Sequence, residues 1–253
     1  MLHDGDGNVT IDGVRAVQAC LRAGVEVVLM SGRRRAQVME DARLFGQSSY
    51  IYEAGACVVL EGEEHWLTGE LMPGELSIAE QIERSGAPAL LLDRYEGLLE
   101  YHEPWHLDRE VSHLFRGLVD AHEVDLLLAE HGHENLRLVD NGVVSRRSEA
   151  LAALPHVRCY HLVPAGASKV AAVAFHRRAR GYERADTFAV GDSREDLACA
   201  AEVDSFWLVA NALERDPSIR RSLGAYVNAR ACEAGHGRGV YEAVVSTLMG
   251  ASD

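Results

Sequence analysis

Short β-branched runs alternate with helix-like segments at both ends of this 253-residue chain. Near the N-terminus, residues 11–23 have helical spacing, residues 25–30 form the apolar run VEVVLM, and residues 34–46 again have a helical pattern. Near the C-terminus, apolar runs at 186–190 and 205–210 flank another helix-like segment. A β-α-β order packs helices against the faces of a parallel sheet. The pattern therefore predicts an α/β fold with a mainly parallel sheet.

The middle of the chain lacks this strict alternation. We expect it to be an inserted α+β module over residues 76–158, which divides the sheet domain into residues 1–75 and 159–253. Within or next to the module, the local patterns predict helices at 75–86 and 107–122, strands at 88–93 and 124–130, and a hairpin at 135–147 that turns at DNG (140–142).

Composition narrows the possible partners. A net charge of −14 argues against nucleic acid or an anionic membrane, but a local pocket can still bind a small anion. The five cysteines are widely spaced and form no CxxC pair, which is typical of a protein of the reducing cytoplasm. No apolar run approaches the ~20 residues of a membrane span.

Ser31, Gly32 and Arg33 follow directly after the predicted strand 25–30. A hydroxyl group and free backbone N–H groups at the end of such a strand suit a phosphate oxygen. The alternative is that Ser31 only caps the following helix.

Lys169 lies in the first turn of the helix predicted from residue 167, where its charge opposes the helix dipole. It is the only lysine among the 25 basic residues, all the others being arginine. Its ammonium group could neutralise a phosphoryl group, although a solvated lysine remains the alternative.

The segment AVGDSREDLACAA carries two carboxylates, Asp192 and Asp196, at the corner between a buried strand and a helix. Such a hard-oxygen pair suits Mg²⁺. The alternative is that Asp192 or Ser193 is the N-cap of this helix and that Asp196 is only a residue of its first turn. We expect Glu53 to be structural or at the mouth of the site, and Trp105 and Trp207 to be packing residues.

Taken in order, these segments resemble the haloacid dehalogenase superfamily, most closely its Cof-type phosphatases, from about residue 9 to the C-terminus. MSGR (30–33) is similar to the second family motif and ASK (167–169) to the third. GDSRED (191–196) is similar to the fourth, with Glu195 at the usual Asn position, and EAGA (53–56) resembles the family segment ENGA, with Ala54 in place of Asn.

The resemblance implies a Rossmann-like core with a cap over residues 76–158 that selects the substrate. It implies Asp192 and Asp196 as Mg²⁺ ligands, and Ser31, Gly32, Arg33 and Lys169 as binding residues for the phosphoryl group, with Ser31 and Lys169 also acting in catalysis.

Family members begin with a buried strand that ends in DxDGT, whose aspartates are the nucleophile and the acid/base. Asp4 and Asp6 match the letters. Counting back from Gly24 through the first helix, however, puts them in the turn after that motif. The expectation is that the first strand and its catalytic pair lie upstream of residue 1, and that this chain has no turnover. The alternative is that Asp4 is the nucleophile and Asp6 the acid/base of a degenerate motif.

The function expected for the whole protein is Mg²⁺-dependent hydrolysis of a small phosphorylated metabolite through an aspartyl-phosphate. A sugar phosphate or a phosphorylated sugar acid, as in mannosyl-3-phosphoglycerate phosphatases, is the favoured substrate. The alternatives are a non-catalytic binder of phosphate esters and a phosphotransferase.

Overall fold

The computed structural model describes residue 6 and residues 8–144 and 148–250. Two compact units divide the chain: unit 1 comprises residues 1–28, 45–47 and 173–253, and unit 2 comprises residues 29–44 and 48–172. Helix α6 (Lys169–Arg180) begins in unit 2 and ends in unit 1.

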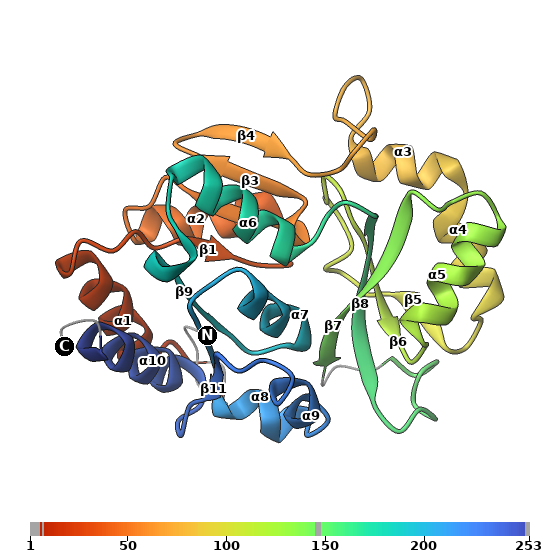
Figure 1. Cartoon of the computed structure of the whole chain (residues 1–253). Helices are drawn as coiled ribbons and strands as arrows, with labels where there is room; N and C mark the ends of the chain where they lie inside the picture. The colour runs from red at the N-terminus through yellow and green to blue at the C-terminus, as the bar shows by residue number, and fades with distance from the viewer. Residues whose placement is uncertain (1–5, 7, 145–147, 251–253) are drawn as a thin grey trace. The chain divides into compact units, whose positions relative to one another are not determined.

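Unit 1 contains a three-stranded parallel sheet in the order β11-β10-β9. Its strands and helices are α1 (Ile11–Arg22), β9 (Phe188–Gly191), α7 (Arg194–Leu197), β10 (Ser205–Leu208), α8 (Ala210–Arg215), α9 (Ile219–Leu223), β11 (Ala229–Ala231) and α10 (His236–Gly250). Helices α1 and α10 lie side by side (Figure 1), where Ala16 and Cys20 pack against Val244. The parallel α/β pattern predicted for this end of the chain is confirmed.

Unit 2 contains two four-stranded sheets. The first has the order β1-β2-β3-β4, and the second has the order β5-β6-β8-β7. The first sheet includes β1 (Leu29–Met30), β2 (Tyr50–Tyr52), β3 (Cys57–Leu60) and β4 (Glu63–Trp66), with α2 (Arg35–Leu44). The second includes β5 (Leu99–Tyr101), β6 (His113–Gly117), β7 (Leu136–Val144) and β8 (Val157–Pro164), with α3 (Ile78–Ser85), α4 (Ala87–Arg94) and α5 (Ala121–Glu130).

The second sheet is antiparallel and has its three helices on one face (Figure 1). Ile82 of α3, Leu91 of α4 and Leu128 of α5 are buried in one core with Phe115 and Tyr160 of the sheet. Strand β8 pairs with β6 and β7 on both sides of residue 159, where we expected the inserted module to end. The module's boundaries therefore stay a prediction.

Several local expectations for the middle are wrong. Residues 88–93 and 124–130 lie in helices α4 and α5 rather than strands, and β6 is a strand inside the expected helix 107–122. Helix α5 begins at the side chain of Asp120, which accepts hydrogen bonds from the backbone N–H groups of His122 and Glu123. The segment 135–144 is one bulged strand rather than a hairpin. Short apolar runs do not distinguish buried helix from strand.

The expected strand 25–30 is also shorter than predicted, since only Leu29 and Met30 pair, in parallel with β2. Among the described residues, β1 has β2 as its single neighbour, and residues 25–30 are half-buried. A β-branched run needs ladder partners to form a central strand. Trp207 is buried in unit 1, as expected.

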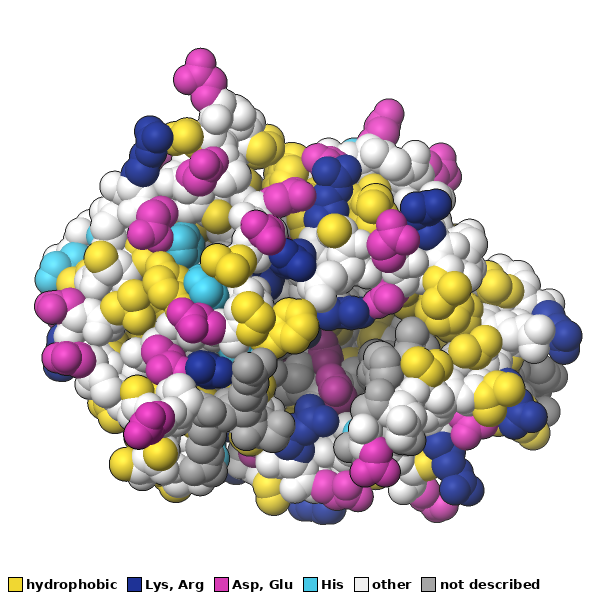
Figure 2. All heavy atoms as spheres, turned by 180° about the vertical axis from the view of Figure 1, so that it is seen from behind, with side chains coloured by type: hydrophobic (Ala, Val, Ile, Leu, Met, Phe, Trp, Pro, Cys, Tyr) yellow, Lys and Arg dark blue, Asp and Glu magenta, His cyan; other side chains and the backbone are white. Residues whose placement is uncertain are grey.

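None of the helices in the described residues has the length and apolar character that a membrane span requires. Figure 2 shows acidic and basic side chains interspersed with hydrophobic ones on the face that it views.

Candidate functional site

The loop after β1 is fixed by backbone hydrogen bonds on both sides. The Ser31 N–H donates to Ile51 O over 3.0 Å, and the Ser31 carbonyl accepts from the Ala54 N–H over 3.2 Å. The Ser31 hydroxyl oxygen accepts from the Arg33 backbone N–H over 3.2 Å. The Ser31 hydroxyl therefore contacts Arg33 in the turn rather than a residue of α2, which begins at Arg35. The predicted contact of this hydroxyl with a phosphate stays a prediction.

Arg33 lies in the turn before α2, and its side chain reaches that helix. Its guanidinium forms an ion pair with Asp41 of α2 and donates from Nε to the Ser31 hydroxyl oxygen over 3.4 Å. Both groups are partly exposed to solvent. In this arrangement Arg33 steadies the Ser31 side chain, and its predicted contact with substrate stays a prediction.

Glu53 lies at the turn between β2 and β3 and is fully buried. Its Oε1 accepts from the Glu110 N–H over 2.8 Å, and its Oε2 accepts from the N–H and the hydroxyl of Ser112 over 2.6 and 2.9 Å. Oε2 also accepts from the Val111 N–H over 3.2 Å, so one carboxylate holds three consecutive backbone positions and fixes the segment 110–112 against this turn. The expected structural role of Glu53 agrees with this geometry.

Arg109 is a buried arginine, with 9% of its surface exposed. Its Nε lies 3.6 Å from the Glu53 carboxylate and donates to the Ser112 hydroxyl over 2.8 Å. Its Nη1 donates to the Trp105 carbonyl over 3.3 Å, and its Nη2 donates to the Gly32 carbonyl. One guanidinium therefore ties the loop after β1 to the segment 105–112. Arg109 could not be predicted as a site residue, because nothing near it in the chain forms a motif.

Lys169 begins α6 and is buried, with its Nζ 3.5 Å from the Asn141 side-chain oxygen. The preceding residue approaches the β2–β3 turn so closely that a Cβ on Gly55 would lie 2.2 Å from the Ser168 carbonyl oxygen. Gly55 also has a φ of 92°. The glycine of the EAGA segment therefore allows the start of α6 to reach this turn.

His161 on β8 is a further buried residue that the sequence did not reveal. A Cβ on Gly32 would lie 2.8 Å from its Nε2, and its Nδ1 lies 3.3 Å from the Ser112 hydroxyl. Burial, together with the charges of Arg109 and Lys169, holds the pKa of His161 well below its ordinary value. The imidazole is therefore neutral at pH 7, and it adjoins two buried cations beside the loop after β1.

The predicted metal ligands lie in unit 1, at the end of β9. The Ser193 hydroxyl caps α7 by accepting from the Asp196 N–H over 3.1 Å, and the Asp196 carboxylate accepts from the Asp192 N–H over 3.0 Å. A Cβ on Gly191 would lie 2.2 Å from the Asp196 Cβ, so only glycine permits this approach. The Asp192 carboxylate is partly exposed, 3.9 Å from the Arg215 guanidinium.

The donor chemistry of this corner fits Mg²⁺, which binds one or two carboxylates and otherwise water and phosphate. Among the described residues no group of three or more His, Cys, Asp or Glu side chains could hold a metal ion by itself. Asp6 is an exposed turn residue, and Asp4 lies outside the described residues.

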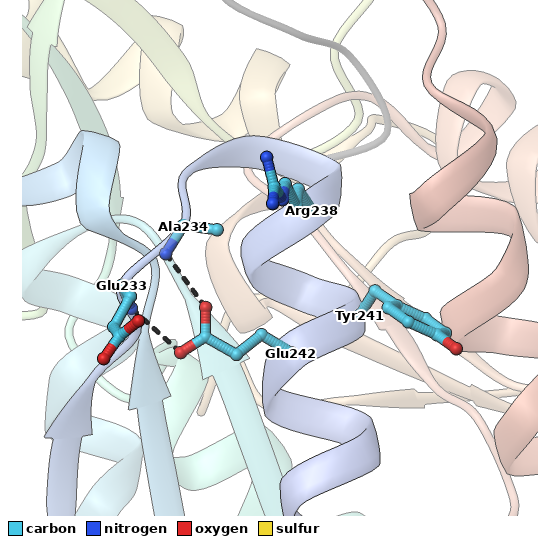
Figure 3. Close-up of a pocket in the computed structure, with 5 residues that line it drawn as sticks. All are labelled: Glu233, Ala234, Arg238, Tyr241 and Glu242. Atoms are coloured by element: carbon cyan, nitrogen blue, oxygen red, sulfur yellow. Dashed lines mark hydrogen bonds between the residues drawn. The ribbon is translucent and has the colours of Figure 1, made fainter.

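An open hollow of about 590 Å³ adjoins the start of α10 (Figure 3). It is lined by Glu233, Ala234, Arg238, Tyr241 and Glu242. The Glu242 carboxylate accepts from the N–H groups of Glu233 and Ala234, both over 2.9 Å. That carboxylate closes the turn before α10, and none of the predicted site residues lines the hollow.

No protein-family model matches the sequence, and no curated protein matches it. Solved structures do match. The sucrose-phosphatase of Synechocystis sp., solved with sucrose and phosphate, has a TM-score of 0.66 at 14% identity, over 94% of this chain and 91% of that chain. A haloacid dehalogenase-like hydrolase from Bacteroides thetaiotaomicron has a TM-score of 0.62 at 14% identity, over 97% and 95%.

A haloacid dehalogenase subclass IIB sugar phosphatase has a TM-score of 0.61 at 13% identity, over 99% of this chain and 94% of that chain. A Cof-like hydrolase from Plasmodium vivax matches as well. The chain therefore has the fold of the haloacid dehalogenase-like hydrolases, and the resemblance stated from the sequence is confirmed at the level of the fold.

Proposed function

We propose that this protein is a Mg²⁺-dependent phosphatase of small phosphorylated metabolites, with a sugar phosphate or a phosphorylated sugar acid as substrate. The observation that carries the proposal is the convergence of the Gly32 backbone, His161 and Lys169 at the loop after β1. The buried positive charges of Lys169 and Arg109 beside the end of a strand favour an anion. The fold, which sugar phosphatases share, supports the same reaction class.

In this proposal Ser31 and Lys169 hold the transferring phosphoryl group, and Gly32 lets the chain approach it. Asp192 and Asp196 hold Mg²⁺, which when bound would offset the negative charge of the phosphate ester. Residues 76–158 form the cap that selects the substrate. The five cysteines are free and buried, which is typical of a protein that functions in a reducing cytoplasm.

An aspartate nucleophile that forms an aspartyl-phosphate belongs to the same proposal. Its position stays a prediction, since Asp6 is an exposed turn residue. The intact mass of the protein from the cells that produce it, compared with the reading frame upstream of residue 1, tests whether an additional strand carries the nucleophile.

Hydrolysis is tested on the protein isolated from those cells, with a panel of hexose phosphates in Mg²⁺ or in EDTA. We expect release of inorganic phosphate in Mg²⁺ alone, and its loss in Lys169→Met and Asp192→Asn. Arg43→Met, on the exposed face of α2, is the matched control for loss of a positive charge. Release that is unchanged in EDTA, or in Lys169→Met, would contradict the proposal.

A binder of phosphate esters without turnover is a second candidate. It is favoured by the exposed position of Asp6, one of the two aspartates that match the family's first motif. Binding of a sugar phosphate with no release of phosphate, in a protein whose native start is Met1, would favour this candidate. Phosphate transfer to an added alcohol would instead indicate a phosphotransferase.

A further inference from the structure

The segment 102–112 is anchored along the loop after β1 by two arginines. Arg109 binds the carbonyl groups of both Trp105 and Gly32. Arg34 donates from Nη1 to the Leu107 carbonyl over 3.3 Å and to the Asp108 carboxylate over 2.9 Å. The backbone of residues 105–108 therefore lies beside residues 32–34, which adjoin the proposed phosphate position.

This anchored segment exposes large apolar side chains. Trp105 is 47% exposed and Leu107 is 52% exposed, so the expectation that Trp105 is a packing residue is wrong. The residue between them is held, since the His106 ring stacks on Tyr101 with ring centres 4.9 Å apart. Within the described part of the chain, Trp105 takes part in none of the ring contacts that order this region.

An exposed indole on a backbone tied at several points is unusual for a residue type that normally buries its large apolar surface. A ligand that covers it would recover that burial without reordering the loop. We expect this ligand to be the leaving group of the phosphate ester, because the Arg109 guanidinium binds both the Trp105 carbonyl and the Gly32 carbonyl in the loop after β1.

We propose that Trp105 is a specificity residue on which the ring of a sugar phosphate stacks through its apolar C–H face. This inference rests on the proposed function and extends it from phosphate esters in general to cyclic sugars. The carboxylates of Glu103 and Asp108, both exposed in the same segment, are acceptors suited to sugar hydroxyls, and Asp108 is also paired with Arg34.

The test compares two esters that differ in the ring alone: glucose 6-phosphate, and the acyclic sorbitol 6-phosphate. Each is titrated in EDTA, which prevents Mg²⁺-dependent turnover, and binding is followed by calorimetry. Inorganic phosphate is the third probe. The expected result is binding of the cyclic ester about tenfold tighter than the acyclic one, the order of an aromatic stacking contact.

Trp105→Ala should remove this preference while leaving the affinity for inorganic phosphate unchanged, and Trp105→Phe should keep part of it. Leu126→Ala on α5, which removes a side chain that is 53% exposed in the same unit, is the matched control. A preference for the ring that survives Trp105→Ala overturns the inference alone. If Trp105→Ala weakens the binding of adenosine 5′-monophosphate as much as that of glucose 6-phosphate, the indole recognises a planar base instead of a sugar. This result also overturns the inference. Failure of the unaltered protein to bind any of the probes overturns the proposed function as well.

Discussion

Replacing the buried carboxylate Glu53 by glutamine tests whether the turn after β2 holds the segment 110–112. The substitution keeps the size of the side chain, but one carboxylate oxygen becomes an amide NH₂ group. If that group takes the place of Oε1, it faces the Glu110 N–H, which donates to this oxygen over 2.8 Å. Arg109, which has 3% of its side chain exposed, also loses the negative charge at 3.6 Å.

The expected loss of stability follows from these contacts. A hydrogen bond to a charged group contributes about 1.5–3 kcal/mol. Removing one partner of a buried ion pair costs about 3–5 kcal/mol. Both terms arise from loss of the same Glu53 charge, so they are not added. We therefore expect Glu53→Gln to lower the free energy of unfolding by about 3–5 kcal/mol, which lowers Tm by roughly 10 °C in a chain of this size.

Urea denaturation followed by circular dichroism measures this change as a shift of the midpoint at constant slope. The control is Asp108→Asn in the same segment. Its ion pair with Arg34 has an aspartate side chain that is 85% exposed, so we expect about 1 kcal/mol or less. A loss below about 1 kcal/mol in Glu53→Gln, or equal losses in the two variants, would refute the argument.

Three further predictions concern other parts of the site. Gly55→Ala should lower stability by more than the ~1–3 kcal/mol of an unfavourable φ, because its Cβ would meet Ser168. Gly69→Ala, with a positive φ and open space around it, is the control by urea denaturation, and equal losses would exclude the clash. The folded state lowers the pKa of His161, so as the pH falls this imidazole is protonated in the unfolded state at a higher pH than in the folded state. Stability should therefore fall as pH drops below 6.5, by up to about 1.4 kcal/mol per pH unit, and His161→Gln should flatten this dependence in urea titrations from pH 7 to 5. An unchanged slope would contradict a buried neutral imidazole. Asp196→Asn should weaken Mg²⁺ binding at least tenfold by calorimetry, whereas Asp186→Asn, an acidic residue ahead of β9, should leave it unchanged.

The parts of the site that follow local rules could be predicted from the sequence. Ser31 and Gly32 follow β1, Lys169 begins α6, and Asp192 follows β9, because strand ends and helix starts carry signals within a few residues. Lys169, the only lysine of the chain, is informative because it lies in the first turn of a helix, where the helix dipole disfavours a positive charge.

The residues that the sequence did not reveal act over long separations in the chain. Arg109 reaches the Gly32 carbonyl, and His161 lies against the same glycine, through strand pairings that no local pattern records. Trp105 belongs to a residue type that is usually buried, and only the fold shows that its side chain is exposed. The helix α5 and the strand β6 were misassigned for a related reason: their short apolar runs fit either structure until the sheet partners are known.

The central claim is that the loop after β1 and Lys169 form an anion site for a phosphate ester. Titration calorimetry with inorganic phosphate, on the unaltered protein and on Lys169→Met, tests it most directly, and Arg43→Met is the control for net charge. We expect the affinity for inorganic phosphate to fall at least tenfold in Lys169→Met and to be unchanged in Arg43→Met. Binding of equal strength in all three proteins, or no binding in the unaltered one, would contradict it.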